Sequence, residues 1–197
     1  MTNSIDLMNK KISNISNLII ELESEFKKEK PEPKRESIRF PRSVIKKARS
    51  YKDYFPFIVD DTLNANIAYT LQLTDVYKWI LNWFDIGLTA KQMLIKHGIA
   101  LFTIVIEALA FDFVKHYSSH KEHSRFSKNL KKLLKAKIIN QEAFNDFDKC
   151  RCMRDDIHLH RLDLPEREKY DMKAYNFALH CIIKMKEIFS QYYISNF

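Results

Sequence analysis

A shortage of glycine and proline limits what this chain of 197 residues can fold into. It contains only two glycines and five prolines. Sheet proteins use these residues at the turns between strands, so their scarcity favours long helices joined by few tight reversals. Apolar residues make up 46% of the chain, which is enough to bury a hydrophobic core. We therefore predict an all-α fold: an up-and-down helical bundle with an N-terminal helical extension.

Hydrophobic residues at helical spacing, together with capping residues, divide the chain into helices. Gly87 is expected to end one helix, and Asn140 is expected to cap another. The predicted helices span residues 3–28, 43–52, 62–86, 89–117, 125–137, 141–158 and 171–193. We expect three segments, namely a heptad helix at 1–29, a basic proline-containing arm at 30–60 and a helical domain at 61–197.

The N-terminal helix carries apolar residues at alternating spacings of three and four. They are Ile5, Met8, Ile12, Ile15, Ile19, Leu22 and Phe26. This is the a/d seam of a coiled coil over three heptads, and it is narrower than the stripe that a helix usually buries against a globular core. Two interpretations stay open: the helix pairs with a coiled-coil partner, or it lies along its own domain.

Positive charge is concentrated in one segment of the chain. The formal net charge is +8, and residues 27–52 hold eleven Lys or Arg against three Glu, a difference that is also +8. Such a field favours a polyanion such as RNA through counterion release, although a solvated linker has the same composition. The residues expected to contact RNA are Arg35, Arg39 and Arg42 in the arm, and Lys131 and Lys135 in the helix at 125–137.

The longest apolar run, from Ile99 to Val114, is too short to span a membrane and contains Glu107 and Asp112. We predict that it forms the buried central helix of a cytoplasmic protein that has no membrane partner. Three cysteines cannot form a complete set of disulfides, and no secretory signal is recognisable at the start of the chain.

Two groups of residues have the composition of metal ligands but not the setting. His116, His120 and His123 can share one helical face, but the serines around them favour an exposed loop. Cys150 and Cys152 are separated by one residue, so they point to different sides of a helix. The chain also has no glycine-rich phosphate-binding loop. We therefore predict neither a metal site nor a cofactor.

The densest mixture of fixed and titratable charge is the stretch CRCMRDDIHLHRLDLP, residues 150–165. Arg154 supplies a planar cation suited to phosphate oxygens. His158 and His160 can exchange protons near neutral pH. Cleavage of RNA by its own 2′-hydroxyl needs a base, an acid and a cation near the phosphorus, and it needs no metal. These three residues are therefore candidate catalytic groups. The expected supporting residues are Arg151 and Asp155.

The same stretch also fits a purely structural role. Asp155 can form an ion pair with Arg151 one helical turn away, and histidines at a helix C-terminus are stabilised by the helix dipole. A salt-bridged helix end therefore stays open as an alternative.

The segment MRDDIHLH resembles the signature of the HEPN superfamily, in which Arg is followed by four to six residues and then His. Five residues separate Arg154 from His160, and six separate Arg151 from His158, so both pairs fit. Leu159 occupies the position at which the family most often has the histidine. The apolar helix with an internal Glu, the leucine-rich basic helix and the long last helix follow the order of the family.

This resemblance covers residues 62–197 and implies a bundle that dimerises so that two Arg–His motifs line one cleft. It implies a metal-independent endoribonuclease of the toxin–antitoxin, abortive-infection or antiviral defence type. RNA is then the substrate, the assembly is a homodimer, and a cognate antitoxin or defence-system protein is a candidate partner. Some members have lost catalysis and only bind RNA or nucleotides. A non-catalytic module that binds RNA or a protein therefore remains the alternative.

Overall fold

The structure, a computed structural model, describes residues 2–29, 40–117, 125–157 and 170–196. The chain divides into two compact units, Met1–Phe40 and Pro41–Phe197. Every regular element among the described residues is a helix, and these residues contain no strand. The prediction of an all-α helical bundle is therefore confirmed.

The first unit contains one helix, α1 (Thr2–Glu29), which matches the helix predicted at 3–28. Four residues of its heptad seam, Ile5, Met8, Ile15 and Ile19, are exposed. A single helix cannot bury its own apolar face, so no described residue of this unit covers the seam. What covers the seam in solution stays a prediction.

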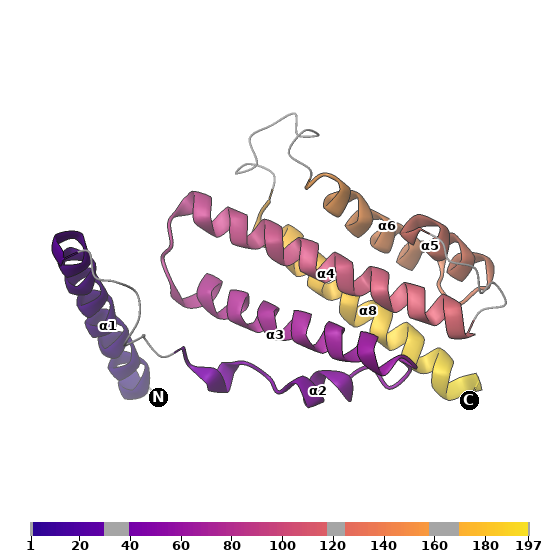
Figure 1. The fold of residues 1–197 in the computed structure, drawn as a ribbon, viewed down its shortest axis with the longest axis horizontal. Coiled ribbons are helices and arrows are strands. Elements are labelled where there is room, and N and C mark those ends of the chain that lie inside the picture. The colour runs from indigo at the N-terminus through magenta and orange to yellow at the C-terminus, as the bar shows by residue number, and fades with distance from the viewer. Residues whose placement is uncertain (1, 30–39, 118–124, 158–169, 197) are drawn as a thin grey trace. The chain divides into compact units, whose positions relative to one another are not determined.

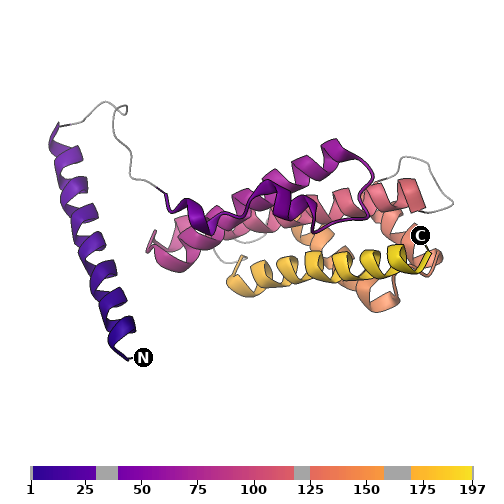
Figure 2. The ribbon, with the colours of Figure 1, turned by 90° about the horizontal axis from the view of Figure 1, so that it is seen from below.

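The second unit is a bundle built around one helix. Its elements are η1 (Arg42–Val44), α2 (Ala48–Lys52), α3 (Asp61–Trp83), α4 (Leu88–Tyr117), α5 (Phe126–Lys135), α6 (Gln141–Asp155) and α8 (Met172–Asn196). The central helix, α4, packs against α3, α5, α6 and α8, with α3 on one side and the pair of α5 and α6 on the other (Figure 1). α3 runs antiparallel to α4, whereas α8 runs beside α4 in the same direction (Figure 2).

The apolar run in the middle of the sequence lies in α4. This is the one described helix that is long and apolar enough to cross a membrane, and half of that apolar window is buried inside the bundle. Phe102, Ile106 and Leu109 are among its fully buried side chains. The predicted central helix is therefore confirmed. The expectation that the run Ile99–Val114 is too short for a membrane span is corrected, because α4 extends beyond this run at both ends.

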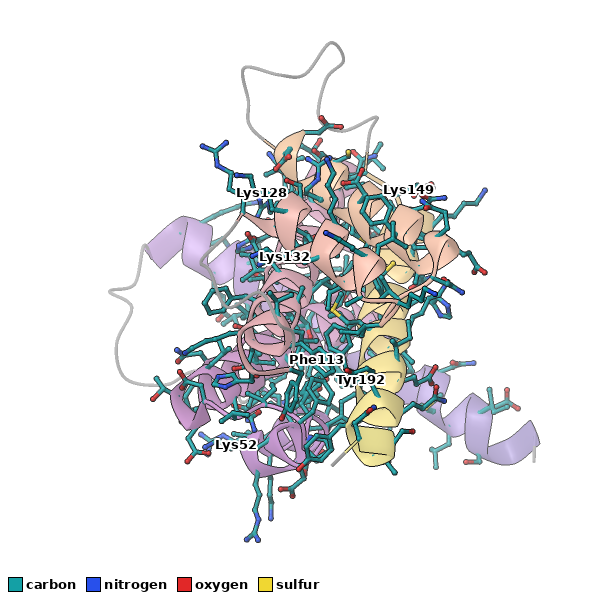
Figure 3. All side chains as sticks on the ribbon, turned by 90° about the vertical axis from the view of Figure 1, so that its right-hand side faces the viewer. Lys52, Phe113, Lys128, Lys132, Lys149 and Tyr192 are labelled. Atoms are coloured by element: carbon teal, nitrogen blue, oxygen red, sulfur yellow. The ribbon has the colours of Figure 1, made fainter. Side chains whose placement is uncertain are left out.

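An aromatic cluster attaches the segment before α3 to the bundle. The ring of Phe57 lies edge-on to Phe113 of α4 and Phe189 of α8, at centroid distances of 5.8 and 5.6 Å. Phe113 and Phe189 stack at 3.9 Å, and Tyr192 closes the cluster beside Phe113 (Figure 3). Each buried phenylalanine removes about 150 Å² or more from water. The second compact unit begins at Pro41 and so includes Phe57, whereas the helical domain was predicted to begin at residue 61.

Hydrogen bonds explain where several helices begin and end. Asn140 caps α6 as predicted, because its Oδ1 accepts from the Ala143 amide at 2.8 Å. The helix predicted at 43–52 is instead split into η1 and α2. The Lys46 amide between them donates to the Asp75 carboxylate of α3 at 2.9 Å, and its carbonyl accepts from Gln72 at 2.8 Å. These hydrogen bonds to α3 replace the backbone hydrogen bonds that Lys46 would form in a continuous helix.

Candidate functional site

The C-terminal end of α6 carries the arginines of the predicted catalytic motif. The helix ends at Asp155, three residues earlier than predicted, and Asp156 follows it as the C-cap. Ile157 is the last described residue before the segment that contains His158 and His160. Both histidines lie outside the described residues, so their catalytic roles stay predictions.

Arg151 is held by two carboxylates of its own helix. Its Nε donates to Asp148 and its Nη1 donates to Asp155, each at 2.7 Å. These partners are three and four residues away and thus lie on the same helical face. Their negative charge, that of Asp148 above all, raises the pKa of Arg151 above its ordinary value. The predicted ion pair between Arg151 and Asp155 is therefore present, and Arg151 is fully charged.

Arg154 connects α6 to the central helix. Its Nη1 donates to the Glu107 carboxylate on α4, and its Nη2 lies 3.4 Å from an oxygen of Asp155. The arginine side chain is 31% exposed and that of Glu107 is 34% exposed. Two of the five N–H donors of the guanidinium belong to these pairs. Because 31% of the Arg154 side chain is exposed, a substrate can reach the guanidinium.

The contact between α4 and α6 beside this ion pair is buried. Thr103 of α4 and Cys150 of α6 have no exposed surface, and the threonine hydroxyl lies 3.4 Å from the Cys150 carbonyl oxygen. Glu107 and Arg154 each follow one of these residues by a single helical turn. The partly exposed ion pair is therefore positioned by a packed helix–helix contact.

The described charges around Arg151 and Arg154 at the end of α6 sum to a negative value. Arg151 and Arg154 contribute two positive charges, and the carboxylates contribute four negative charges, a difference of −2. The four carboxylates are Asp148, Asp155, Asp156 and Glu107. A phosphate that approaches Arg154 must therefore displace a carboxylate or be accompanied by further positive charge.

Tyr170 joins the two ends of the histidine segment. Its side chain is 3% exposed, and its hydroxyl donates to the Asp156 carbonyl oxygen at 3.2 Å. The described residues on either side of residues 158–169 are thus bonded to each other. The role of Tyr170 could not be predicted from the sequence, because a single aromatic residue before a helix carries no signal for a bond to a residue fourteen positions earlier.

The described residues among those predicted to bind RNA do not form one surface. Arg42 of η1 is exposed, and so are Lys131 and Lys135, which lie one turn apart on α5. However, η1 packs against α3 and α5 packs against the opposite side of α4. Figure 3 shows Lys128 and Lys132 of α5 on the side of the bundle that is opposite to Lys52 of α2. Arg35 and Arg39 lie outside the described residues.

The residues considered as metal ligands are only partly described. Cys150 is buried and Cys152 is exposed, which confirms that they point to different sides of the helix. The neighbouring Cys181 thiol and burial both raise the pKa of Cys150, so this thiol is packed rather than reactive. His120 and His123 lie outside the described residues. Within the described ranges, no three His, Cys, Asp or Glu side chains lie close enough to hold a metal ion.

Among the described residues, the end of α6 therefore combines an accessible arginine with a surplus of carboxylates. No protein-family model matches the chain, and neither a curated protein nor a solved structure matches it at a significant level.

Proposed function

We propose that this chain is a metal-independent endoribonuclease of the HEPN type, in which Arg154 binds the scissile phosphate. The supporting observation is the position of Arg154. It lies on the last turn of α6, is 31% exposed, and is followed in the sequence by His158 and His160. A guanidinium fork matches the geometry of phosphate oxygens better than a lysine does.

The proposed reaction uses the RNA's own 2′-hydroxyl. A histidine, His160 or His158, removes the proton from this hydroxyl, and the 2′ oxygen attacks the phosphorus. Arg154 stabilises the negative charge that develops on the phosphate oxygens. An acid then protonates the leaving 5′ oxygen. The products are a 2′,3′-cyclic phosphate and a 5′-hydroxyl, and no step requires a metal.

The ion pair with Glu107 holds Arg154 in place before the substrate binds. Both side chains are about a third exposed, so their pairing is worth roughly 1 kcal/mol or less. A bidentate Arg–phosphate pair is a charge-assisted contact of comparable geometry. The phosphate can therefore replace Glu107 at little cost, and the guanidinium remains on the surface of the bundle.

A homodimer would bring two copies of the motif to one cleft. The exposed seam of α1 offers one surface through which two copies can associate. We propose a cytoplasmic toxin or antiviral defence effector that acts on RNA, with a cognate antitoxin or defence-system protein as its partner.

A second candidate is a non-catalytic module that binds RNA or a protein. The observation that favours it is the charge of −2 at the end of α6, since both arginines already have carboxylate partners. In that case RNA would bind to the exposed basic residues of η1 and α5, away from the motif.

Cleavage of a labelled RNA by the full chain in EDTA tests this proposal. Arg154→Ala should reduce the rate by about 100-fold or more, because it removes the cation at the phosphate. Arg154→Lys should recover only part of the rate, since it keeps the charge but not the fork. Lys173→Ala, at an exposed position on α8, is the control. Binding without cleavage by the unmodified chain would favour the second candidate.

Alanine variants of the two histidines then assign the working pair. Loss of cleavage in His160→Ala alone identifies the pair of Arg154 and His160. Loss of cleavage in His158→Ala alone identifies the pair of Arg151 and His158. Full cleavage by both histidine variants and by Arg154→Ala would contradict the proposed mechanism.

A further inference from the structure

A half-open pocket lies between α2, α3 and α8, away from the end of α6. Its volume is about 620 Å³, within the range of roughly 300–1,000 Å³ that is typical of small-molecule sites. No residue of α6 lines it. Its walls combine an apolar floor with a basic and aromatic rim, and these two parts would contact different parts of a ligand.

The floor of the pocket is apolar and comes from three helices. It consists of Leu71 of α3, Phe102 of α4, and Leu179, Ile182 and Ile183 of α8. The Phe102 side chain is 2% exposed, so the floor is continuous with the core of the bundle. Such a surface favours a ligand with a compact aliphatic or aromatic body.

The rim of the pocket is positively charged. Asp75 accepts from the Lys46 amide at 2.9 Å and from the Tyr51 hydroxyl at 2.8 Å, so its carboxylate already has donors. Lys46 and Lys78 line the same pocket, and neither forms an ion pair within the described residues. The Lys46 ammonium lies 5.4 Å from the centroid of the Tyr51 ring, which also lines the pocket. Two cations and one carboxylate leave the rim with a charge of +1. This balance favours a ligand with a single negative charge.

A buried tyrosine supplies a hydrogen-bond donor. Tyr175 lines the pocket and its side chain is 2% exposed, but its hydroxyl is not among the buried polar atoms that lack a partner within the described residues. Its ring is fixed by Phe102 at a centroid distance of 4.9 Å and by Gly98, where an added Cβ would collide with the ring. Burial, followed by the charge of Asp75, raises its pKa to about 12, so the hydroxyl keeps its proton. A ligand acceptor in the pocket can therefore accept a hydrogen bond from this protonated hydroxyl.

We propose that this pocket binds a small organic carboxylate. Its apolar body lies on the floor formed around Phe102, and its carboxylate accepts from the Tyr175 hydroxyl near Lys46 and Lys78. A cation is disfavoured by the two lysines. A polyphosphate would bring more negative charge than two lysines can balance beside Asp75. This inference does not depend on the proposed nuclease activity.

Calorimetric titration of the full chain with two acids and their matched alcohols tests the inference. The acids are octanoate, with an aliphatic body, and 3-phenylpropionate, with an aromatic body. The neutral partners are octan-1-ol and 3-phenylpropan-1-ol. We expect saturable binding of at least one acid, with the corresponding alcohol about tenfold weaker because it has no charge to meet the lysines. Comparison of the two acids identifies the body that the floor prefers.

Two variants connect that binding to the residues of the pocket. Tyr175→Phe should weaken the preferred acid about fivefold through loss of one hydrogen bond. It breaks no hydrogen bond within the protein, so its melting temperature should not fall. Lys78→Ala, at an exposed position, should weaken the acid but not the alcohol. Lys91→Ala, exposed on α4, is the control and should bind both ligands normally.

Two results would overturn the proposal. One is the absence of saturable binding by both acids. The other is an affinity for the acid that is unchanged in both single variants, Lys78→Ala and Tyr175→Phe. If Tyr175→Phe fails to fold, Lys78→Ala still decides, because its side chain belongs to the surface. Neither measurement involves RNA, so the result leaves the proposed nuclease activity as a separate question.

Discussion

Arg154 of α6 forms an ion pair with Glu107 of α4, a residue 47 positions earlier in the sequence. This pair joins the predicted RNA-cleaving motif to the central helix of the bundle. It also places a carboxylate where a phosphate would have to bind. Arg154 can act as a catalytic residue only if a substrate phosphate replaces the Glu107 carboxylate beside it; otherwise its role is structural.

Glu107→Gln should raise the affinity for RNA, because it removes a carboxylate that competes for Arg154 and repels phosphate. The free energy of unfolding should fall by no more than about 1 kcal/mol, since the pair is partly exposed. Filter binding and urea denaturation measure the two effects. Glu142→Gln is the matched control, since Glu142 pairs with Lys184 at 2.7 Å between α6 and α8. A weaker affinity for RNA in Glu107→Gln alone would show that Arg154 needs its carboxylate and does not exchange it.

The seam of α1 should be essential for association of the chain. Ile12→Asp combined with Ile19→Asp places charges at two a positions, where they cannot be buried unpaired. The mass in solution should fall to that of one chain, as measured by light scattering. Ile20→Asp is the control on the same helix, because Ile20 is 62% exposed and lies outside the seam. An unchanged mass in the double variant would leave α1 with a role within its own chain.

The charges beside the seam predict that two copies of α1 associate in antiparallel orientation. The register that pairs a with d positions sets Lys11 against Glu25 of the second copy and brings the two Leu18 side chains together. A parallel pair would instead set Leu18 against Glu23. All four residues are exposed on α1. Charged residues at flanking positions determine the orientation of coiled coils.

A charge exchange tests this orientation by sedimentation equilibrium. Lys11→Glu should weaken association, and adding Glu25→Lys in the same chain should restore it. In a parallel pair, Lys11→Glu would meet Ser16 and have little effect. Full association of Lys11→Glu would therefore contradict the antiparallel arrangement.

The exposed basic residues should account for the salt dependence of RNA binding. Replacing Arg35, Arg39 and Arg42 with alanine should lower the slope of log K against log salt by about 0.7 for each lost phosphate contact on single strands. Replacing Lys131 and Lys135 tests the face of α5 separately, because it lies on another side of the bundle. Lys91→Ala with Lys173→Ala is the control for total charge. A slope that is the same in every variant would assign RNA binding to other residues.

Asp112 should make the protein less stable as the pH rises. Burial raises the pKa of this carboxyl, whose side chain is 1% exposed, above its ordinary value. A group with a raised folded-state pKa adds stability below its ordinary pKa, and this stability is lost as the pH rises through the folded-state pKa. Asp112→Asn carries no charge and can still accept from the Val59 amide. Its free energy of unfolding relative to the parent should therefore increase as the pH rises from about 4, the ordinary pKa of an aspartate, through the raised folded-state pKa. A constant difference in urea denaturation over this range would contradict the assignment.

The features that could be predicted from the sequence are local. The helices around Ile67, Leu109 and Phe147 follow from apolar residues at helical spacing, and these three side chains are buried. The cap at Asn140 depends on a residue three positions away, so a short window of sequence contains it. The pair of Arg151 and Asp155 could be predicted for the same reason.

The features that could not be predicted join distant residues. Phe55 and Phe57 belong to the core, but basic residues and prolines dominate the composition of their surroundings. Arg154 has its partner on another helix, and no periodicity within either helix indicates this contact. Gly98 makes room for the Tyr175 ring of another helix, and nothing in the sequence around Gly98 indicates this contact.

The chemistry of the RNA ends tests the proposed nuclease mechanism most directly. The full chain is incubated with RNA in EDTA, and the products are analysed by mass spectrometry. We predict 2′,3′-cyclic phosphate and 5′-hydroxyl ends, and no cleavage of a substrate whose nucleotide at the cut site is 2′-deoxy, because that substrate lacks the nucleophile. Cleavage of the deoxy substrate, 5′-phosphate ends, or cleavage that requires added magnesium would contradict the mechanism.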